Sequence, residues 1–89
     1  MEQSACEFMQ KVRSTDEWTI RYALRGFIDF LEIDQEDIPE FVAILEARCL
    51  KTIASLSADL GSGCNDKRVI SDLKIRGTII RICKEYNCA

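Results

Sequence analysis

Seven carboxylates fall within residues 27–46, and this stretch contains no Lys or Arg. They are Asp29, Glu32, Asp34, Glu36, Asp37, Glu40 and Glu46. Carboxylates can bind a metal ion, serve as general acid and base, dock a basic partner, or stabilise the start of a helix. The spacing of the acids and the residues between them separate these possibilities.

A calcium loop requires oxygen ligands at fixed positions and a glycine at its sixth residue. Counted from Asp34, the fifth residue is Ile38 and the sixth is Pro39, so the pattern fails. A catalytic role would need further groups, and the chain has no His, no nucleophile motif and no Gly-rich phosphate loop. The sequence therefore predicts no enzymatic activity, no metal site and no cofactor.

The acids divide into two groups by their place along the expected helices. Acids at a helix N-terminus each stabilise it by about 0.3–1 kcal/mol, which explains Asp34, Asp37 and Glu40. Asp29, Glu32 and Glu36 follow the preceding helix instead, where the helix dipole disfavours negative charge. They indicate either an ordinary solvated turn or an acidic surface that docks a partner.

Five cysteines, an odd number, occur in a chain whose N-terminus lacks the features of a secretion signal. This composition predicts free thiols that are mostly small buried side chains. Zinc is the alternative, with Cys64, Cys83 and Cys88 as ligands. A tetrahedral site would need a fourth ligand, so we expect no zinc.

A row of basic residues marks the last quarter of the chain. Lys67, Lys74 and Arg81 recur every seven residues and should line one face of a helix, with Lys84 close by. This row could face the acidic turn of its own chain or an acidic partner. Nucleic acid is the alternative ligand, which the net charge of -3 and the lack of interleaved aromatic residues disfavour.

These groups must be positioned by helices, because helical periodicity and start signals run through the whole sequence. The spacings Ser4–Glu7 and Ser14–Glu17 resemble capping boxes, Asp37 precedes a proline suited to a first turn, and GSG at 61–63 suits a helix end. Asn65 or Asp66 should cap the last helix. Residues 77–82, GTIIRI, are β-branched but have no partner strand. The prediction is an all-α bundle of four helices at about 5–13, 16–33, 38–60 and 66–86.

Apolar periodicity predicts the side chains that share the core. They should be Phe41, Leu45, Cys49 and Ile53 together with Trp18, Leu24, Phe27 and Leu31. Ile20, Phe30 and Ile33 fall outside this stripe, so we expect them to form an exposed apolar patch.

The totals are those of one domain, residues 1–89, with 47% apolar residues and 30% charged residues. No apolar run reaches the length of a membrane span, so we expect a cytoplasmic or nuclear protein that does not enter a membrane. No motif in the sequence is specific to a protein family.

The predicted function is a non-enzymatic protein–protein interaction module: an adaptor, a regulatory subunit or an oligomerisation domain. The apolar patch would make the contact, as a homodimer or in a hetero-complex, and the acidic turn and basic helix would complement a partner's charge. The alternative is a small helical domain that binds nucleic acid through the basic row.

Overall fold

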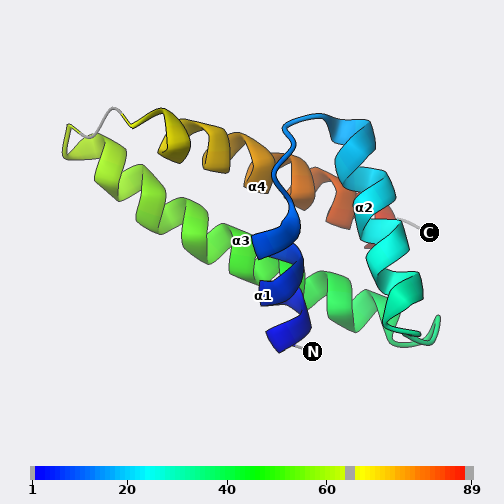
Figure 1. Ribbon diagram of the computed structural model, residues 1–89. Coiled ribbons are helices and arrows are strands. Elements are labelled where there is room, and N and C mark those ends of the chain that lie inside the picture. Colours follow the sequence, from blue (N-terminus) through cyan, green and yellow to red (C-terminus); the bar gives the residue numbers. More distant parts are fainter. Residues whose placement is uncertain (1, 64–65, 88–89) are drawn as a thin grey trace.

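The chain folds into four α-helices, in a computed structural model that describes residues 2–63 and 66–87. They are α1 (Glu2–Lys11), α2 (Glu17–Phe30), α3 (Ile38–Gly61) and α4 (Lys67–Asn87) (Figure 1). The described residues contain no strand, and the β-branched stretch at 77–82 lies within α4. The all-α prediction is confirmed, with each observed helix end within three residues of its expected position.

The two long helices determine the shape of the molecule. α3 and α4 pack against each other as an antiparallel hairpin, α1 packs on α3, and α2 packs on α4 (Figure 1). The molecule measures 43 × 24 × 21 Å, since the hairpin extends well beyond the two shorter helices. One end of the hairpin is thus covered by α1 and α2, and the other end is not.

The starts of the first two helices differ from the predicted capping boxes. Ser4 lies inside α1, which already includes Glu2. At α2 the N-cap is Asp16, whose Oδ2 accepts hydrogen bonds from the backbone N–H of Thr19 at 2.9 Å and its hydroxyl at 2.8 Å. These bonds lower the pKa of Asp16, because they stabilise its carboxylate form. Ser14 accepts from the backbone N–H of Asp16.

The later helix starts follow the sequence more closely. Asp37 occupies the N-cap position of α3 but makes no side-chain capping bond, and a proline stands in the first turn. Asp66 accepts a hydrogen bond from the backbone N–H of Arg68 at 2.9 Å and so helps to cap α4. Asn65, the other candidate cap, lies outside the described residues.

The end of α2 is a tight reversal built on Glu32. This residue has φ 54, in the left-handed region where glycine is the usual occupant. The N–H of Ile33 reaches back to the carbonyl of Ile28 at 3.3 Å, and the N–H of Glu32 to that of Asp29 at 3.1 Å. This is the bond pattern of a Schellman motif, and it sets Ile33 against the core, half-buried.

The core lies where all four helices meet. Phe8 of α1, Phe27 of α2 and Phe41 of α3 form a chain of rings, with centroids 5.5 Å apart for Phe8–Phe27 and 6.3 Å for Phe27–Phe41. The remaining buried apolar side chains of the helices surround these rings: Ala5, Ile20, Leu24, Ile28, Val42, Leu45, Cys49, Ile75, Ile79, Ile82 and Cys83. Residues far apart in the sequence therefore share one core.

The predicted burial of two residues on α2 was wrong, because the structure shows the opposite for each. Ile20, expected in an exposed patch, is only 1% exposed, and Trp18, expected in the core, is 61% exposed. Positions 18 and 20 lie about 200° apart around a helix, so only one of them can face inward. The inward stripe passes through Ile20, Leu24, Phe27 and Ile28, which leaves Trp18 on the outer side.

The far half of the α3–α4 hairpin carries less of the core than its apolar periodicity predicts. Ile53, expected to be buried, is only partly buried, as are Leu56, Val69 and Leu73. The reason is that only α3 and α4 face each other there, without α1 or α2 above them (Figure 1). Leu31, which was also predicted to be in the core, is half-buried at the C-terminal end of α2.

Candidate functional site

An aromatic face runs along the solvent side of α2. We give this name to Trp18, Tyr22 and Phe30, which are 61%, 66% and 77% exposed. With Gly26 they follow a spacing of four residues, so each position is turned by about 40° from the one before, and the row winds around the side of the helix opposite its buried stripe. The predicted patch of Ile20, Phe30 and Ile33 does not form, because Ile20 is buried and Ile33 is half-buried; of the three, only Phe30 belongs to the exposed aromatic face.

Neighbouring cations cover the aromatic face in part. The rings of Trp18 and Tyr22 lie 6.5 Å apart, and the Arg21 guanidinium lies 5.0 Å from the Trp18 ring centroid. The Lys11 ammonium lies 6.0 Å from the Phe30 ring. Such contacts hold the rings in place while leaving their outer edges in water.

Gly26, in the middle of this face, is not required by the packing of the chain itself. A Cβ built at this position would meet no other atom within 4 Å. A glycine inside a helix costs about 1 kcal/mol relative to alanine. The open position lets another molecule approach the backbone of α2 closely between Tyr22 and Phe30.

The acidic turn, residues 29–37, joins α2 to α3. Its five acids are all exposed: Asp29, Glu32, Asp34, Glu36 and Asp37. None of them forms an ion pair in the described parts of the chain, where the acidic partners are Glu2, Glu17, Asp72 and Glu85. Contact between this turn and the basic residues of the same chain, one of the two expected arrangements, is thus not observed there.

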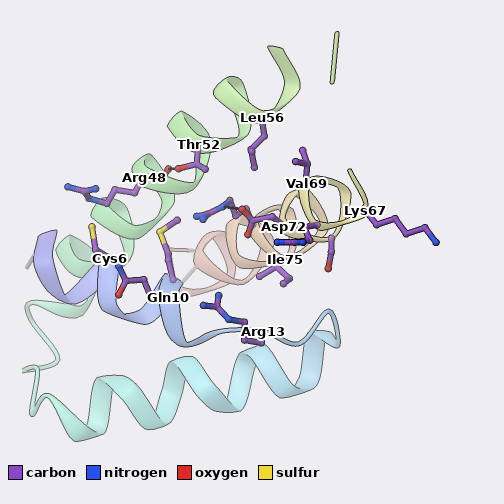
Figure 2. A pocket seen from close by; sticks show the side chains of 14 residues that line it. Cys6, Gln10, Arg13, Arg48, Thr52, Leu56, Lys67, Val69, Asp72 and Ile75 are labelled. Carbon is purple, nitrogen blue, oxygen red and sulfur yellow. Dashed lines mark hydrogen bonds and ion pairs between the residues drawn. The ribbon is translucent and has the colours of Figure 1, made fainter. Parts of the chain in front are cut away.

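A groove of about 780 Å³ opens between α1, the middle of α3 and the first half of α4 (Figure 2). Its apolar walls come from Met9, Leu56, Val69 and Ile75, and Figure 2 shows Leu56 on α3 and Val69 on α4 at the same end of the groove. The Cys6 thiol also lines the groove. The hairpin's incomplete cover by α1 produces this opening.

Basic residues dominate the polar side chains of the groove. Arg13, Arg48, Lys67, Arg68 and Arg76 line it, with a single acid, Asp72. Asp72 pairs with Arg76 at 3.2 Å, and Arg48 pairs with Glu2 at 3.4 Å. Arg13, Lys67 and Arg68 have no ion-pair partner among the described residues, so the groove carries a net positive charge.

Two buried guanidinium atoms in the groove wall also lack acceptors. Nε of Arg48 and Nη1 of Arg76 make no hydrogen bond within the described chain. A buried donor without a partner is costly, typically by about 1–3 kcal/mol. An acceptor that entered the groove could offset this cost if either side chain turned toward it.

The predicted basic row does not form one continuous site. Lys67 borders the groove, whereas Lys74 and Arg81 line a separate shallow hollow with Thr15 and Gly77. The Arg81 guanidinium donates a hydrogen bond to Thr78 at 3.3 Å, and Lys84 is exposed on the last turns of α4. The row thus follows one helix, but its members border different surfaces.

The ion pair that links α2 to α4 was not predicted. The Arg21 guanidinium donates two hydrogen bonds to the Glu85 carboxylate, one of them from Nε at 3.2 Å. Glu85 is also part of a smaller hollow of about 340 Å³ beside the α2 end, together with Asp29 and Tyr86. This bidentate contact links the side of α2 near Trp18 to the last turns of α4.

Two of the described thiols, those of Cys49 and Cys83, are not placed for chemistry. Cys49 and Cys83 are fully buried, and burial raises the pKa of Cys49 to about 11 and that of Cys83 to about 12. Such thiols remain protonated at neutral pH and are poor nucleophiles and metal ligands. No group of three potential metal ligands occurs within the described residues, and Cys64 and Cys88 lie outside them.

The residues that sequence reasoning missed differ in how they could have been found. Trp18 and Tyr22 were missed, although they share a spacing of four with Gly26 and with Phe30, which was expected to be exposed; the apolar residues of the buried stripe hide this signal in the sequence. Arg13, Arg48 and Arg76 come from three separate segments and meet only in the folded chain. No linear pattern could have joined them.

Comparison with known proteins identifies no relative: no protein-family model, curated protein or solved structure matches this chain. No described helix combines the length and hydrophobicity needed to cross a membrane.

Proposed function

We propose that this chain is a non-enzymatic protein–protein interaction module, acting as an adaptor, a regulatory subunit or an oligomerisation domain. The observation that carries the proposal is the aromatic face of α2, with three large rings that are each more than three-fifths exposed. Aromatic residues are enriched in the centres of protein interfaces, where they contribute a large share of the binding energy.

The aromatic face suits a protein partner more than it suits the stability of the isolated chain. The core is complete without Trp18, Tyr22 and Phe30, because the buried stripe of α2 lies on its opposite side. Trp and Tyr lose little side-chain freedom on binding and offer both an apolar ring and a polar atom. A partner's helix laid along α2 could use the open space at Gly26 for close contact.

Charge would orient the partner. Arg21 and Arg25 lie beside the aromatic face, while the acidic turn follows it directly in the chain. A surface with both signs of charge near an apolar centre favours one binding orientation over others. The non-enzymatic assignment is supported by the buried thiols, whose raised pKa suppresses their nucleophilic form. We place the module in the cytoplasm or nucleus.

Affinity capture from the native cell, followed by measurement of binding to each purified candidate, tests this proposal. The double variant Trp18→Ala/Tyr22→Ala should bind the partner about 100-fold more weakly than the wild type, as expected for the loss of two central aromatic side chains. Leu50→Ala is the matched control, since Leu50 is also exposed, at 53%, but lies on α3. Equal affinities for the wild type and the aromatic variant would refute the proposal.

Nucleic acid is the competing outcome of the same experiment. Binding through Lys74, Arg81 and Lys84 would be unaffected by the aromatic variant and would weaken steeply as salt increases. Charge reversal at Lys74 and Arg81 would then abolish binding. A specific complex with RNA or DNA that shows this behaviour would replace the protein-interaction assignment.

A further inference from the structure

We propose that the groove between α1, α3 and α4 binds the acidic turn of a second copy of this chain, so that copies associate head to tail. This inference rests on the proposed function, because it also assigns a protein contact to this chain. The contact is made by the groove and the acidic turn, however, and not by Trp18 and Tyr22. The partner is an identical chain, which contributes the other of these two surfaces.

The groove combines an apolar floor with a basic border. Leu56, Val69 and Ile75 form apolar walls, and Arg13, Lys67 and Arg68 have no ion-pair partner within the described residues. Its complement is a segment with a large apolar side chain flanked by carboxylates. No aromatic residue lines the described groove, so it offers bases nothing to stack on, and a peptide suits it better than a nucleic acid.

The acidic turn of the chain itself has that composition. Phe30 is 77% exposed at its start, and five exposed carboxylates accompany it without any basic residue between positions 29 and 37. The Schellman reversal at Glu32 and Ile33 fixes the backbone, so the turn is presented in one conformation. A preformed turn loses little conformational freedom when it binds.

Helix dipoles add a reason for the two surfaces to meet. The first two residues of α4, Lys67 and Arg68, place positive charge at a helix N-terminus, and its first turn contains no acid. The last turn of α2 contains Asp29 and no basic residue. At the start of α4 the capping carboxylate of Asp66 offsets part of this positive charge, whereas the last turn of α2 contains no cation that would offset Asp29. Contact between the two helix ends would bring further opposite charge to each.

Geometry prevents this contact within one molecule. The α3 residues that line the groove extend from Arg48 to Leu56, and the acidic turn joins α3 at Ile38. At a rise of 1.5 Å per residue, Arg48 lies about 15 Å and Leu56 about 27 Å along the helix from Ile38. α3 is a continuous helix, so it holds the turn away from the groove of the same chain (Figure 1). The turn of one copy must enter the groove of the next, an arrangement that yields an open chain or a closed ring.

Sedimentation velocity of the full chain over a wide concentration range tests the inference, in about 0.05 M and about 0.5 M NaCl. The wild type should associate beyond a dimer, and high salt should weaken this association by about tenfold or more. The groove variant is Lys67→Glu/Arg68→Glu, and the turn variant is Asp34→Asn/Glu36→Gln. Each variant alone should remain a monomer.

A mixture of the two variants distinguishes head-to-tail contact from a symmetric one. The groove variant retains an intact turn, and the turn variant retains an intact groove, so an equimolar mixture should form a 1:1 dimer and nothing larger. Melting curves control for folding. The groove variant should melt at the wild-type temperature or above it, because acids replace bases at the start of α4.

The aromatic variant Trp18→Ala/Tyr22→Ala separates this inference from the proposed function. It should associate like the wild type if the groove and turn make the contact. Association lost in this variant but retained in the groove and turn variants would overturn the head-to-tail inference and leave the aromatic face as the interaction surface. A wild type that stays monomeric at every concentration and salt would overturn it as well.

Discussion

Replacing Glu32 with Gly is expected to stabilise the chain, although it removes a whole side chain. Glu32 has φ 54, and a residue with a Cβ pays about 1–2 kcal/mol to adopt this left-handed conformation. Glycine adopts it without that penalty but loses more freedom on folding, which offsets about 0.4–1 kcal/mol. The substitution also removes a negative charge from the C-terminal end of α2. We expect a net gain of about 0.5–1 kcal/mol in the free energy of unfolding.

Glu32→Ala provides the matched control. Alanine removes the same charge but keeps the Cβ, so the difference between the two variants isolates the backbone contribution. Urea unfolding followed by far-UV circular dichroism measures both free energies, and an unchanged slope with denaturant shows that the unfolded states are comparable. The Gly variant should exceed the Ala variant by about 0.5 kcal/mol, because the charge effect is common to both.

Two results would refute this reasoning. If Glu32→Gly were less stable than Glu32→Ala, the left-handed conformation at this position would not exist in solution. If Glu32→Ala alone matched the full gain of the Gly variant, the charge at the end of α2 would account for the effect, and the backbone of the Schellman motif would contribute nothing measurable.

Three further predictions concern the core and the thiols. Phe41→Ala should lower the free energy of unfolding by about 3–5 kcal/mol, because Phe41 is fully buried against Phe27. A loss below about 1 kcal/mol in urea unfolding would contradict the packing of α3. The pKa of Cys49 and that of Cys83 lie above the ordinary 9.0 in the folded chain, so the unfolded chain loses these protons first. The contribution of the thiols to stability should therefore be constant from neutral pH to about pH 9 and should fall as pH rises toward 11 and 12; a stability that rose from pH 9 to 12 would be inconsistent with buried thiols. Reducing agent and chelator should each leave the melting temperature unchanged, and a drop of many degrees with chelator alone would reveal a metal site.

The helices were predictable because their signals are local. The apolar period of α3 continues for most of its length, and Pro39 and GSG at 61–63 lie at its two ends. Capping was less predictable: Ser14, Asp16 and Glu17 all resemble start signals, and only the backbone geometry shows that Asp16 makes the bonds. Sequence alone cannot choose among neighbouring capping residues.

The faces of α2 were not predictable from its own residues. Apolar side chains occur around most of this helix, so both Trp18 and Ile20 were compatible with a buried stripe. The position of the neighbouring helices decides the matter, because α2 packs on α4 and buries Ile20, Leu24 and Ile28 in the common core. The groove is a stronger case, since Arg13, Arg48 and Arg68 become neighbours only through tertiary packing.

The most direct measurement of the central claim is site-specific photocrosslinking in the native cell. A photoreactive phenylalanine analogue placed at Tyr22, on the aromatic face, should form a covalent adduct with one protein in high yield. The same analogue at Asp59, exposed on the far part of α3 and outside the groove, should form none above background. A reproducible protein adduct at position 22 alone is the predicted result. Equal background at both positions would contradict the assignment of the aromatic face as a protein-binding surface.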